Sequence, residues 1–167
     1  VPLGRYEDRL RDLVLEMKRP DGQGLAAAIG QWFVVRRGEE LGLLRPQLVA
    51  PIPHHWQRWL RQPASSPHTL ARELARGLGV PVKRELLRCQ RKLKRQHDLL
   101  PRERFRNVRG AFALGGSTAV NGLRILLVDD ILTTGATCSE AARTLKRAGA
   151  AWVGAAIVAR AADDLHY

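Results

Sequence analysis

The sequence predicts an α/β fold, an open parallel sheet with helices on both faces and a small helical segment at the N-terminus. Two observations support this prediction. Apolar segments that look extended alternate along the chain with segments of helical periodicity, and strands separated by helices form parallel sheets. One segment, residues 125–128, is apolar at every position, which is typical of a central strand buried on both faces.

The predicted elements follow in order from the N-terminus. Leu10, Leu13, Val14 and Met17 recur at helical spacing and predict the first helix. Ser66 is a candidate N-cap for the third helix. Helices are predicted over residues 6–18, 25–41, 66–78 and 137–148, and strands over residues 47–50, 108–114, 124–128 and 152–159.

Length and composition indicate one domain with a small appendage. The chain has 167 residues, of which 45% are hydrophobic, enough for one buried core. We assign residues 1–45 to an N-terminal helical segment and residues 46–167 to the domain that contains the sheet. No segment approaches the roughly 20 apolar residues that span a bilayer, and the first residues lack an apolar signal core. We therefore expect a cytoplasmic protein without membrane insertion.

Cysteine usage and charge limit the classes of ligand. Cys89 and Cys138 lie far apart and form no C-x-x-C pair, so we expect free thiols and no zinc in this chain. Lysines and arginines number 28 against 16 acidic residues, and the formal net charge is +12. Such a balance favours polyanionic partners, either nucleic acid or the phosphates of a small molecule.

Two adjacent carboxylates, Asp129 and Asp130, follow the predicted central strand. In open α/β sheets, ligands bind just beyond the carboxyl ends of the strands. Neighbouring carboxylates can accept hydrogen bonds from a vicinal diol, while one of them orients the other or a metal-bound water. We therefore predict that Asp129 and Asp130 are the catalytic pair of a ligand site.

A loop of hydroxyl groups and open backbone comes next. Gly135 is free to adopt positive φ, and Thr137 opens a predicted helix whose positive end faces the loop. An ordinary turn with helix-capping threonines is the alternative, but the apolar strand before the loop and the helix after it favour a phosphate site. Together with the acids, this loop predicts a ribose 5-phosphate site. The predicted phosphate-binding residues are Thr133, Thr134, Gly135, Ala136 and Thr137.

Residues 125–138 (ILLVDDILTTGATC) resemble, over their whole length, the phosphoribosyl-diphosphate (PRPP) signature of type I phosphoribosyltransferases. More of the chain resembles one branch of that superfamily, the ComF competence-protein family. The matching positions are Pro51-Ile52-Pro53, His55 and Arg58 for its P-x-P-x-H-x-x-R loop, Arg91, Gln96, Arg104, Asn107-Val108 and Gly110-Ala111-Phe112 for its R-x-T-x-x-Q and R-x-x-N-V-x-G-A-F segments, and Tyr6, Lys18 and Ala159-Arg160 near the ends.

The resemblance implies a type I phosphoribosyltransferase-like sheet and PRPP as ligand. It further implies transfer of the phosphoribosyl group to a nitrogen acceptor with release of pyrophosphate. Mg²⁺ would be held chiefly by the substrate and water, with Asp129 or Asp130 assisting. The residues that the resemblance places near pyrophosphate are Pro53, His55, Arg58, Arg91 and Gln96.

Two segments depart from the family pattern. Residues 62–65 (QPAS) stand where the family has R-G-F-N, and Leu93 replaces the threonine of R-x-T. Both segments should approach pyrophosphate, so the sequence leaves open whether the chain turns PRPP over or only binds it. The acceptor, the oligomeric state and the presence of a zinc module before residue 1 are equally open.

Residues 83–109 carry eleven lysines and arginines against three acids. Three uses fit this imbalance: a loop that closes on pyrophosphate, a groove that follows a nucleic-acid backbone, or a solvated surface without a fixed ligand. The second use supports an alternative function. In that alternative the protein handles single-stranded DNA during DNA uptake without catalysis, and PRPP acts as a regulatory ligand.

Overall fold

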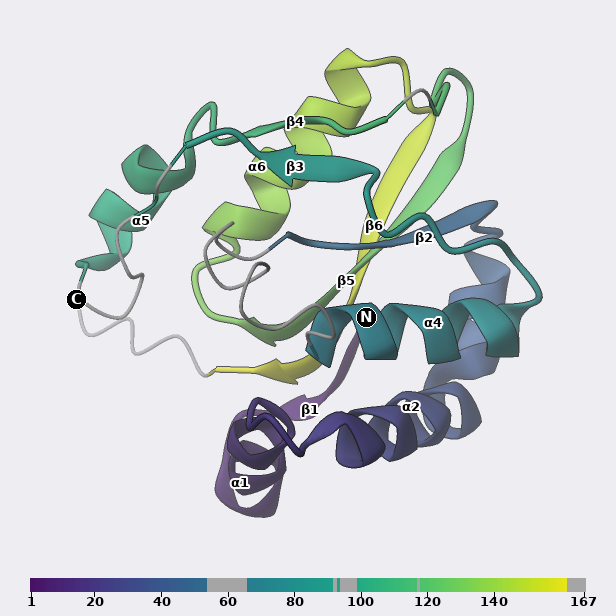
Figure 1. The fold of residues 1–167 in the computed structure, drawn as a ribbon, viewed down its shortest axis with the longest axis vertical. Helices are drawn as coiled ribbons and strands as arrows, with labels where there is room; N and C mark the ends of the chain where they lie inside the picture. Colours follow the sequence, from purple (N-terminus) through teal and green to yellow (C-terminus); the bar gives the residue numbers. More distant parts are fainter. Residues whose placement is uncertain (54–65, 92, 94–98, 117, 162–167) are drawn as a thin grey trace.

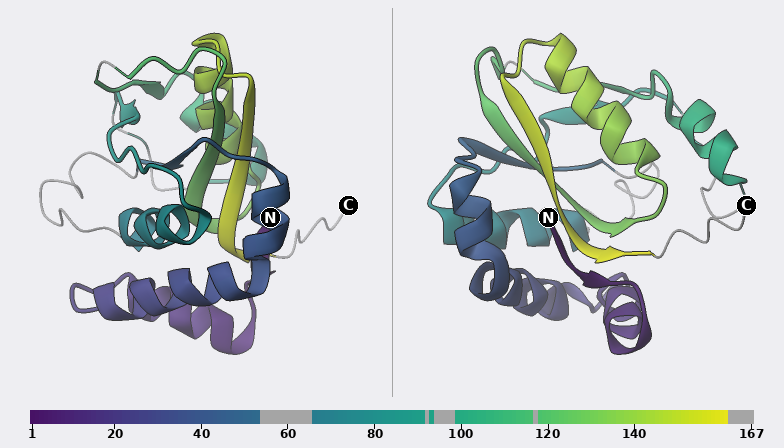
Figure 2. Two further views of the ribbon diagram at one scale, coloured as in Figure 1. Left: turned by 90° about the vertical axis from the view of Figure 1, so that its right-hand side faces the viewer. Right: turned by 180° about the vertical axis from the view of Figure 1, so that it is seen from behind.

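The computed structural model describes residues 1–53, 66–91, 93, 99–116 and 118–161 (Figure 1). Within these residues, a four-stranded parallel sheet forms the centre of the molecule. Helices cover one face of this sheet, and a further helix with a two-stranded ribbon covers the other (Figures 1 and 2). The α/β architecture predicted from the sequence is confirmed.

All neighbouring strands of the main sheet run parallel. Backbone pairing fixes the register. Leu126 pairs with Val49 of one neighbouring strand and with Gly154 of the other. The strands, in their order across the sheet, are β1 (Pro2–Arg5), β6 (Trp152–Arg160), β5 (Arg124–Leu132) and β2 (Leu48–Pro51).

Strand β5 is apolar from Ile125 to Val128 because this part lies between two hydrophobic layers. Leu126 and Val128 pack into the core on one face of the sheet. Ile125 and Leu127 pack into the core on the other face. Side chains alternate between the two faces of a strand, so a strand covered on both sides needs an apolar residue at every position.

Three helices cover the first face of the sheet (Figure 2). Their buried centre contains Met17, Phe33, Leu70 and Leu74, all almost fully removed from solvent. The helices are α1 (Asp8–Met17), α2 (Gln23–Leu43) and α4 (Ser66–Leu78). The three helices predicted in this part of the chain are therefore confirmed.

The second face is covered by helix α6 (Ala136–Arg147) and by a ribbon of two antiparallel strands. The strands of the ribbon are β3 (Leu87–Cys89) and β4 (Phe112–Leu114), and helix α5 (Pro101–Val108) lies between them in the sequence. Helix α5 also packs against α6. The basic segment 83–109 thus contributes a strand and a helix on this side of the sheet.

Two local expectations need correction. The strand predicted over 108–114 is only Phe112–Leu114, because α5 continues to Val108 and Gly110 then turns the chain with φ +66°. The N-terminal segment predicted to be helical begins with a strand, because the backbone of residues 2–5 pairs with the edge of β6. A strand this short has no sequence pattern of its own.

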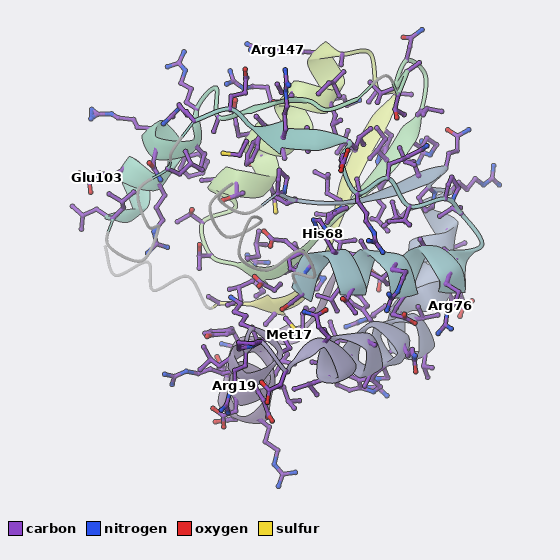
Figure 3. All side chains as sticks on the ribbon, in the orientation of Figure 1. Met17, Arg19, His68, Arg76, Glu103 and Arg147 are labelled. Atoms are coloured by element: carbon purple, nitrogen blue, oxygen red, sulfur yellow. The ribbon has the colours of Figure 1, made fainter. Side chains whose placement is uncertain are left out.

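Ser66 makes a contact between two helices, and its predicted role as a cap stays a prediction. Its hydroxyl group donates a hydrogen bond of 2.7 Å to the backbone carbonyl of Met17. Met17 is the last residue of α1, and Figure 3 shows it at the end of α1 that faces α4. The contact therefore ties the start of α4 to the end of α1.

No helix within the described ranges has the length and apolar character needed to cross a membrane.

Helices α2 and α4 approach closely at Gly30. A Cβ atom added at Gly30 would lie 2.7 Å from the Cβ atom of Glu73 on α4. The Gly30→Ala substitution is expected to lower the free energy of unfolding by about 1–3 kcal/mol, because an extra methyl group in a packed contact forces the two helices apart. Urea unfolding followed by circular dichroism measures this change.

Gly24 provides the matched control in the same helix. A Cβ atom there would meet no atom within 4 Å, so Gly24→Ala should leave the free energy of unfolding unchanged or raise it slightly through helix propensity. Equal stability of the two variants would contradict the close packing of α2 on α4.

Candidate functional site

Asp129 and Asp130 lie inside strand β5, which continues to Leu132. The strand is longer than predicted because its backbone pairs with β6 as far as Leu132, opposite Arg160. The two acids are 4% and 5% exposed. They are therefore held near the carboxyl end of a central strand, where ligands of open α/β sheets bind.

Hydrogen bonding orders this pair of acids. One carboxylate oxygen (Oδ1) of Asp129 accepts a hydrogen bond of 2.9 Å from the backbone N–H of Asp130. The carboxylate of Asp130 forms an ion pair with Lys18, whose Nζ atom lies 3.1 Å from Oδ2. Buried carboxylates need such partners, because removing a charge from water is costly unless it is paired or hydrogen-bonded.

The loop after β5 leads directly into helix α6. Gly135 is the residue before the helix and has φ +74°, a conformation that glycine adopts without the steric penalty of a Cβ atom. Its carbonyl accepts the N–H of Ser139, and the N–H of Ala136 lies 3.5 Å from the hydroxyl oxygen of Thr134. Helix α6 therefore begins at Ala136, one residue before the predicted start at Thr137.

This helix start suits an anion. The first turn of α6 contains no acidic residue, while Lys146 and Arg147 lie in the last turn. The positive end of the helix dipole therefore faces the loop, and no acidic residue of the helix's own first turn neutralises it. Thr133 is exposed and Thr134 is partly exposed. The structure brings the predicted phosphate loop and the acid pair together in one continuous strand, loop and helix.

Strand β2 brings the Pro51-Ile52-Pro53 segment to the same end of the sheet. Pro51 pairs with Val128, and the N–H of Ile52 donates to the carbonyl of Val128 over 2.9 Å. Pro53 therefore follows directly after Ile52, whose backbone is bound to Val128, the residue before the acid pair. His55 and Arg58 lie outside the described residues.

Arg91 has a structural contact in addition to its predicted role. Its guanidinium group donates hydrogen bonds to the carbonyls of Asn107 and Arg109, at 2.7 Å and 3.0 Å. These bonds connect the end of helix α5 to the part of the chain that follows strand β3. Contact between Arg91 and pyrophosphate stays a prediction, and Gln96 lies outside the described residues.

Glu140 joins helix α6 to Gly110, the residue that follows the basic segment. Its buried carboxylate accepts the N–H of Gly110 at 2.8 Å and the guanidinium of Arg143 at 2.6 Å and 2.9 Å. Burial raises the pKa of Glu140, but the hydrogen bonds from Arg143 and Gly110 outweigh it and lower the pKa below its usual value. Sequence analysis missed this contact, because a lone glutamate on an amphipathic helix carries no signal.

The carboxylates of the site are ligands of the type that Mg²⁺ prefers. Among the described residues, no group of three or more histidine, cysteine, aspartate or glutamate side chains could enclose a metal ion. Asp129 and Asp130 supply oxygen ligands, which Mg²⁺ prefers. Either carboxylate would take one ligand position of an ion whose other ligands are substrate oxygens and water.

Comparison with known proteins gives the family of this chain. The family model described as the phosphoribosyl transferase domain matches residues 63–166. The chain belongs to this family. The match includes the acid pair, the glycine loop and helix α6, which are the parts that build the site.

Curated relatives confirm the resemblance to the ComF competence-protein family. DNA utilization protein YhgH of Salmonella typhimurium is 32% identical over 160 residues, which cover 92% of this chain and 68% of the relative. Competence protein F of Haemophilus influenzae is 26% identical over 154 residues, which cover 89% of this chain and 67% of the relative.

Solved structures share the fold. A glutamine PRPP amidotransferase from B. subtilis has a TM-score of 0.55 and 22% identity, over 89% of this chain and 30% of that chain. A purine phosphoribosyltransferase from Pyrococcus horikoshii has a TM-score of 0.51 and 15% identity, over 81% of this chain and 83% of that chain. The predicted type I phosphoribosyltransferase-like sheet is therefore confirmed.

Cys138, in the first turns of helix α6, reports on the charge of the site. Burial raises the pKa of its thiol to about 12, and the negative charge of Asp129 acts in the same direction. The prediction concerns alkylation by iodoacetamide in a Cys89→Ala background. At about pH 8, Cys138 should react about 100-fold more slowly than free cysteine, or slower still, because the thiolate is the reacting form.

The Asp129→Asn substitution tests the sign of the electrostatic contribution to the pKa of Cys138. Removing the negative charge should lower the pKa of Cys138 and speed its alkylation, while the effect of burial remains. A pH series of alkylation rates measures both quantities. Reaction of Cys138 as fast as free cysteine would contradict the described environment.

Proposed function

We propose that the protein binds PRPP and transfers its phosphoribosyl group to a nitrogen acceptor, with release of pyrophosphate. One observation carries the proposal. The buried pair Asp129 and Asp130 and the positive end of helix α6 belong to one segment, separated only by a short loop that turns at Gly135. A sugar phosphate carries a diol and an anion in one small molecule, so this segment suits one such ligand.

The binding roles follow from the chemistry of each part. Asp129 and Asp130 would accept hydrogen bonds from the two ribose hydroxyls, since carboxylates are strong acceptors. Residues 133–137 would hold the 5′-phosphate with hydroxyl and backbone N–H groups at the helix start. Pro53 and Arg91 are the described residues assigned to the pyrophosphate side, and their contacts are part of the proposal.

Transfer requires one bond to break and one to form. The bond between C1 of the ribose and the pyrophosphate oxygen breaks, C1 bonds to the acceptor nitrogen, and that nitrogen loses a proton. The transition state gains positive charge on the ribose, which the neighbouring carboxylates stabilise. When bound to the substrate, Mg²⁺ would neutralise charge on departing pyrophosphate. The protein's main contribution is then to position the two reactants.

Calorimetry with PRPP and Mg²⁺ tests the binding part of the proposal. We expect Asp129→Asn together with Asp130→Asn to weaken PRPP binding by more than about 100-fold, because a hydrogen bond to a charged group contributes roughly 1.5–3 kcal/mol. Asp21→Asn is the matched control, since Asp21 is an exposed acid near the end of α1. The absence of heat from the wild type, or unchanged binding by the double variant, would refute the proposal.

Turnover needs a separate measurement. The protein is incubated with PRPP, Mg²⁺ and a panel of nitrogen bases and amines, and released pyrophosphate is assayed. Release that requires both an acceptor and the acid pair supports transfer. Binding of PRPP without any release would limit the function to binding and remove the transfer step.

A second candidate function is the non-catalytic handling of single-stranded DNA, with PRPP as a regulatory ligand. Relatives with the names DNA utilization protein and competence protein favour it. In the basic segment, Phe105 is half-exposed on α5, and Arg106 and Arg109 are exposed beside it. Arginines can contact phosphates while an aromatic ring stacks on a base, a combination that single-strand binding proteins use.

A gel shift with labelled single-stranded DNA across a salt series tests this candidate. Affinity should fall steeply with salt, and Arg106→Gln plus Arg109→Gln should reduce the slope of log affinity against log salt by about 1–2, since each phosphate contact contributes about 0.7. Arg36→Gln plus Arg37→Gln, two exposed arginines on α2, form the matched control. Negligible binding, or an equal effect of the control pair, would reject the candidate.

A further inference from the structure

Lys18 connects the N-terminal helices to the acid pair. It is the residue that follows helix α1, and its backbone N–H donates to the carbonyl of Leu15 at 3.3 Å. Its Nζ atom lies 3.1 Å from Oδ2 of Asp130, and the side chain of Lys18 is only 27% exposed. This ion pair reaches from the first helix of the chain into the centre of the proposed PRPP site.

The chain around Lys18 is held in a tight conformation. The preceding carbonyl, of Met17, accepts the hydroxyl of Ser66 in a buried hydrogen bond. After Lys18 the chain turns back at once, and the N–H of Gly22 donates to Arg19 at 3.0 Å. A Cβ atom at Gly22 would lie 2.5 Å from the carbonyl oxygen of Glu16. The backbone at Lys18 is therefore held on both sides, and the ion pair with Asp130 places the ammonium.

The charge of Lys18 matters because of what lies beside it. Asp129 and Asp130 are adjacent and almost fully buried, so their negative charges repel each other where water screens them poorly. A sugar phosphate brings further negative charge to the same end of the sheet. A cation in contact with Asp130 reduces this repulsion and fixes the direction in which the carboxylate presents its other oxygen.

We infer that Lys18 is a positioning residue that orients Asp130 for the ribose hydroxyls and so gives the site its preference for ribose over 2-deoxyribose. The inference rests on the proposed function, because it assigns the diol to the acid pair. It goes further in naming a residue outside the sheet that sets sugar specificity. Lys18 acts through Asp130 on the diol and leaves the 5′-phosphate loop unaffected.

A thermodynamic consequence concerns the N-terminal helices. If Lys18 strengthens ligand binding through Asp130, then ligand binding strengthens the Lys18 contact by the same factor. Helix α1 and the turn that follows it should therefore be protected from hydrogen exchange when ribose 5-phosphate binds, although the phosphate loop lies elsewhere in the chain.

The test compares two ligands that differ only in one hydroxyl group. Dissociation constants of ribose 5-phosphate and 2-deoxyribose 5-phosphate are measured by calorimetry for the wild type, Lys18→Gln and Lys18→Arg. Lys18→Gln should weaken ribose 5-phosphate binding roughly tenfold and 2-deoxyribose 5-phosphate binding much less, so that the preference shrinks. Lys18→Arg keeps the charge and should retain most of the preference. Arg19→Gln, an exposed neighbour, is the control.

The outcomes separate the inference from the function that it rests on. Equal weakening of both ligands, or an unchanged preference in Lys18→Gln, overturns the inference and leaves PRPP binding intact. Failure of the wild type to bind PRPP overturns the proposed function and the inference with it. A wild type that binds both sugars equally overturns the assignment of the diol.

A measurement on the wild type covers the case in which Lys18→Gln does not fold. Acetic anhydride labelling with mass spectrometry gives the reactivity of each lysine. Lys18 should react more slowly than the exposed Lys83, and ribose 5-phosphate should protect it further, because the ion pair with Asp130 is then tighter. Reaction of Lys18 as fast as Lys83, with no effect of the ligand, overturns the inference.

Discussion

Two adjacent carboxylates buried at the end of a central strand are the constraint on which the rest of this structure depends. Neither Asp129 nor Asp130 has more than a few per cent of its surface in water. Charges so placed must be hydrogen-bonded, paired or both. The backbone N–H of Asp130 and the ammonium of Lys18 meet part of that need. The sheet supplies a rigid frame, so the two acids are held in place before any ligand arrives.

The elements around the sheet are joined to this centre by a few polar contacts. On one face, the hydroxyl of Ser66 binds the end of α1, next to Lys18. On the other face, Glu140 accepts the N–H of Gly110 and so attaches the end of the basic segment to helix α6, which begins at the predicted phosphate loop. Apolar packing determines which faces meet, and these directional contacts determine how the pieces align near the acids. Segments far apart in the sequence thus contribute to one site.

The two functions proposed use different parts of the molecule and are compatible. The proposed sugar phosphate site is formed by β5, its loop and the start of α6, whereas the basic segment presents exposed cations and Phe105 on α5. Arg91 lies in the basic segment yet holds its own backbone together through Asn107 and Arg109. Part of the positive charge of this segment is therefore structural, which a count of lysines and arginines cannot reveal.

The sequence by itself determined the central strand, the acid pair, the glycine loop and the helix after it. These features depend on local physics: an apolar run for burial on both faces, carboxylates at the strand end, and a glycine that allows positive φ. The three helices on the first face were also predicted, with each end within two residues of its observed position, because helical periodicity is a local pattern.

Only the tertiary structure decided which distant residues complete the site. Lys18 closes an ordinary amphipathic helix, and nothing near it in the sequence points to Asp130. Strand β1 exists because β6 offers an edge, and the 108–114 segment divides between a helix and a ribbon strand because Gly110 turns the chain between them. Pairing of charges and of backbone across the fold depends on distances in space, and local sequence patterns do not encode such distances.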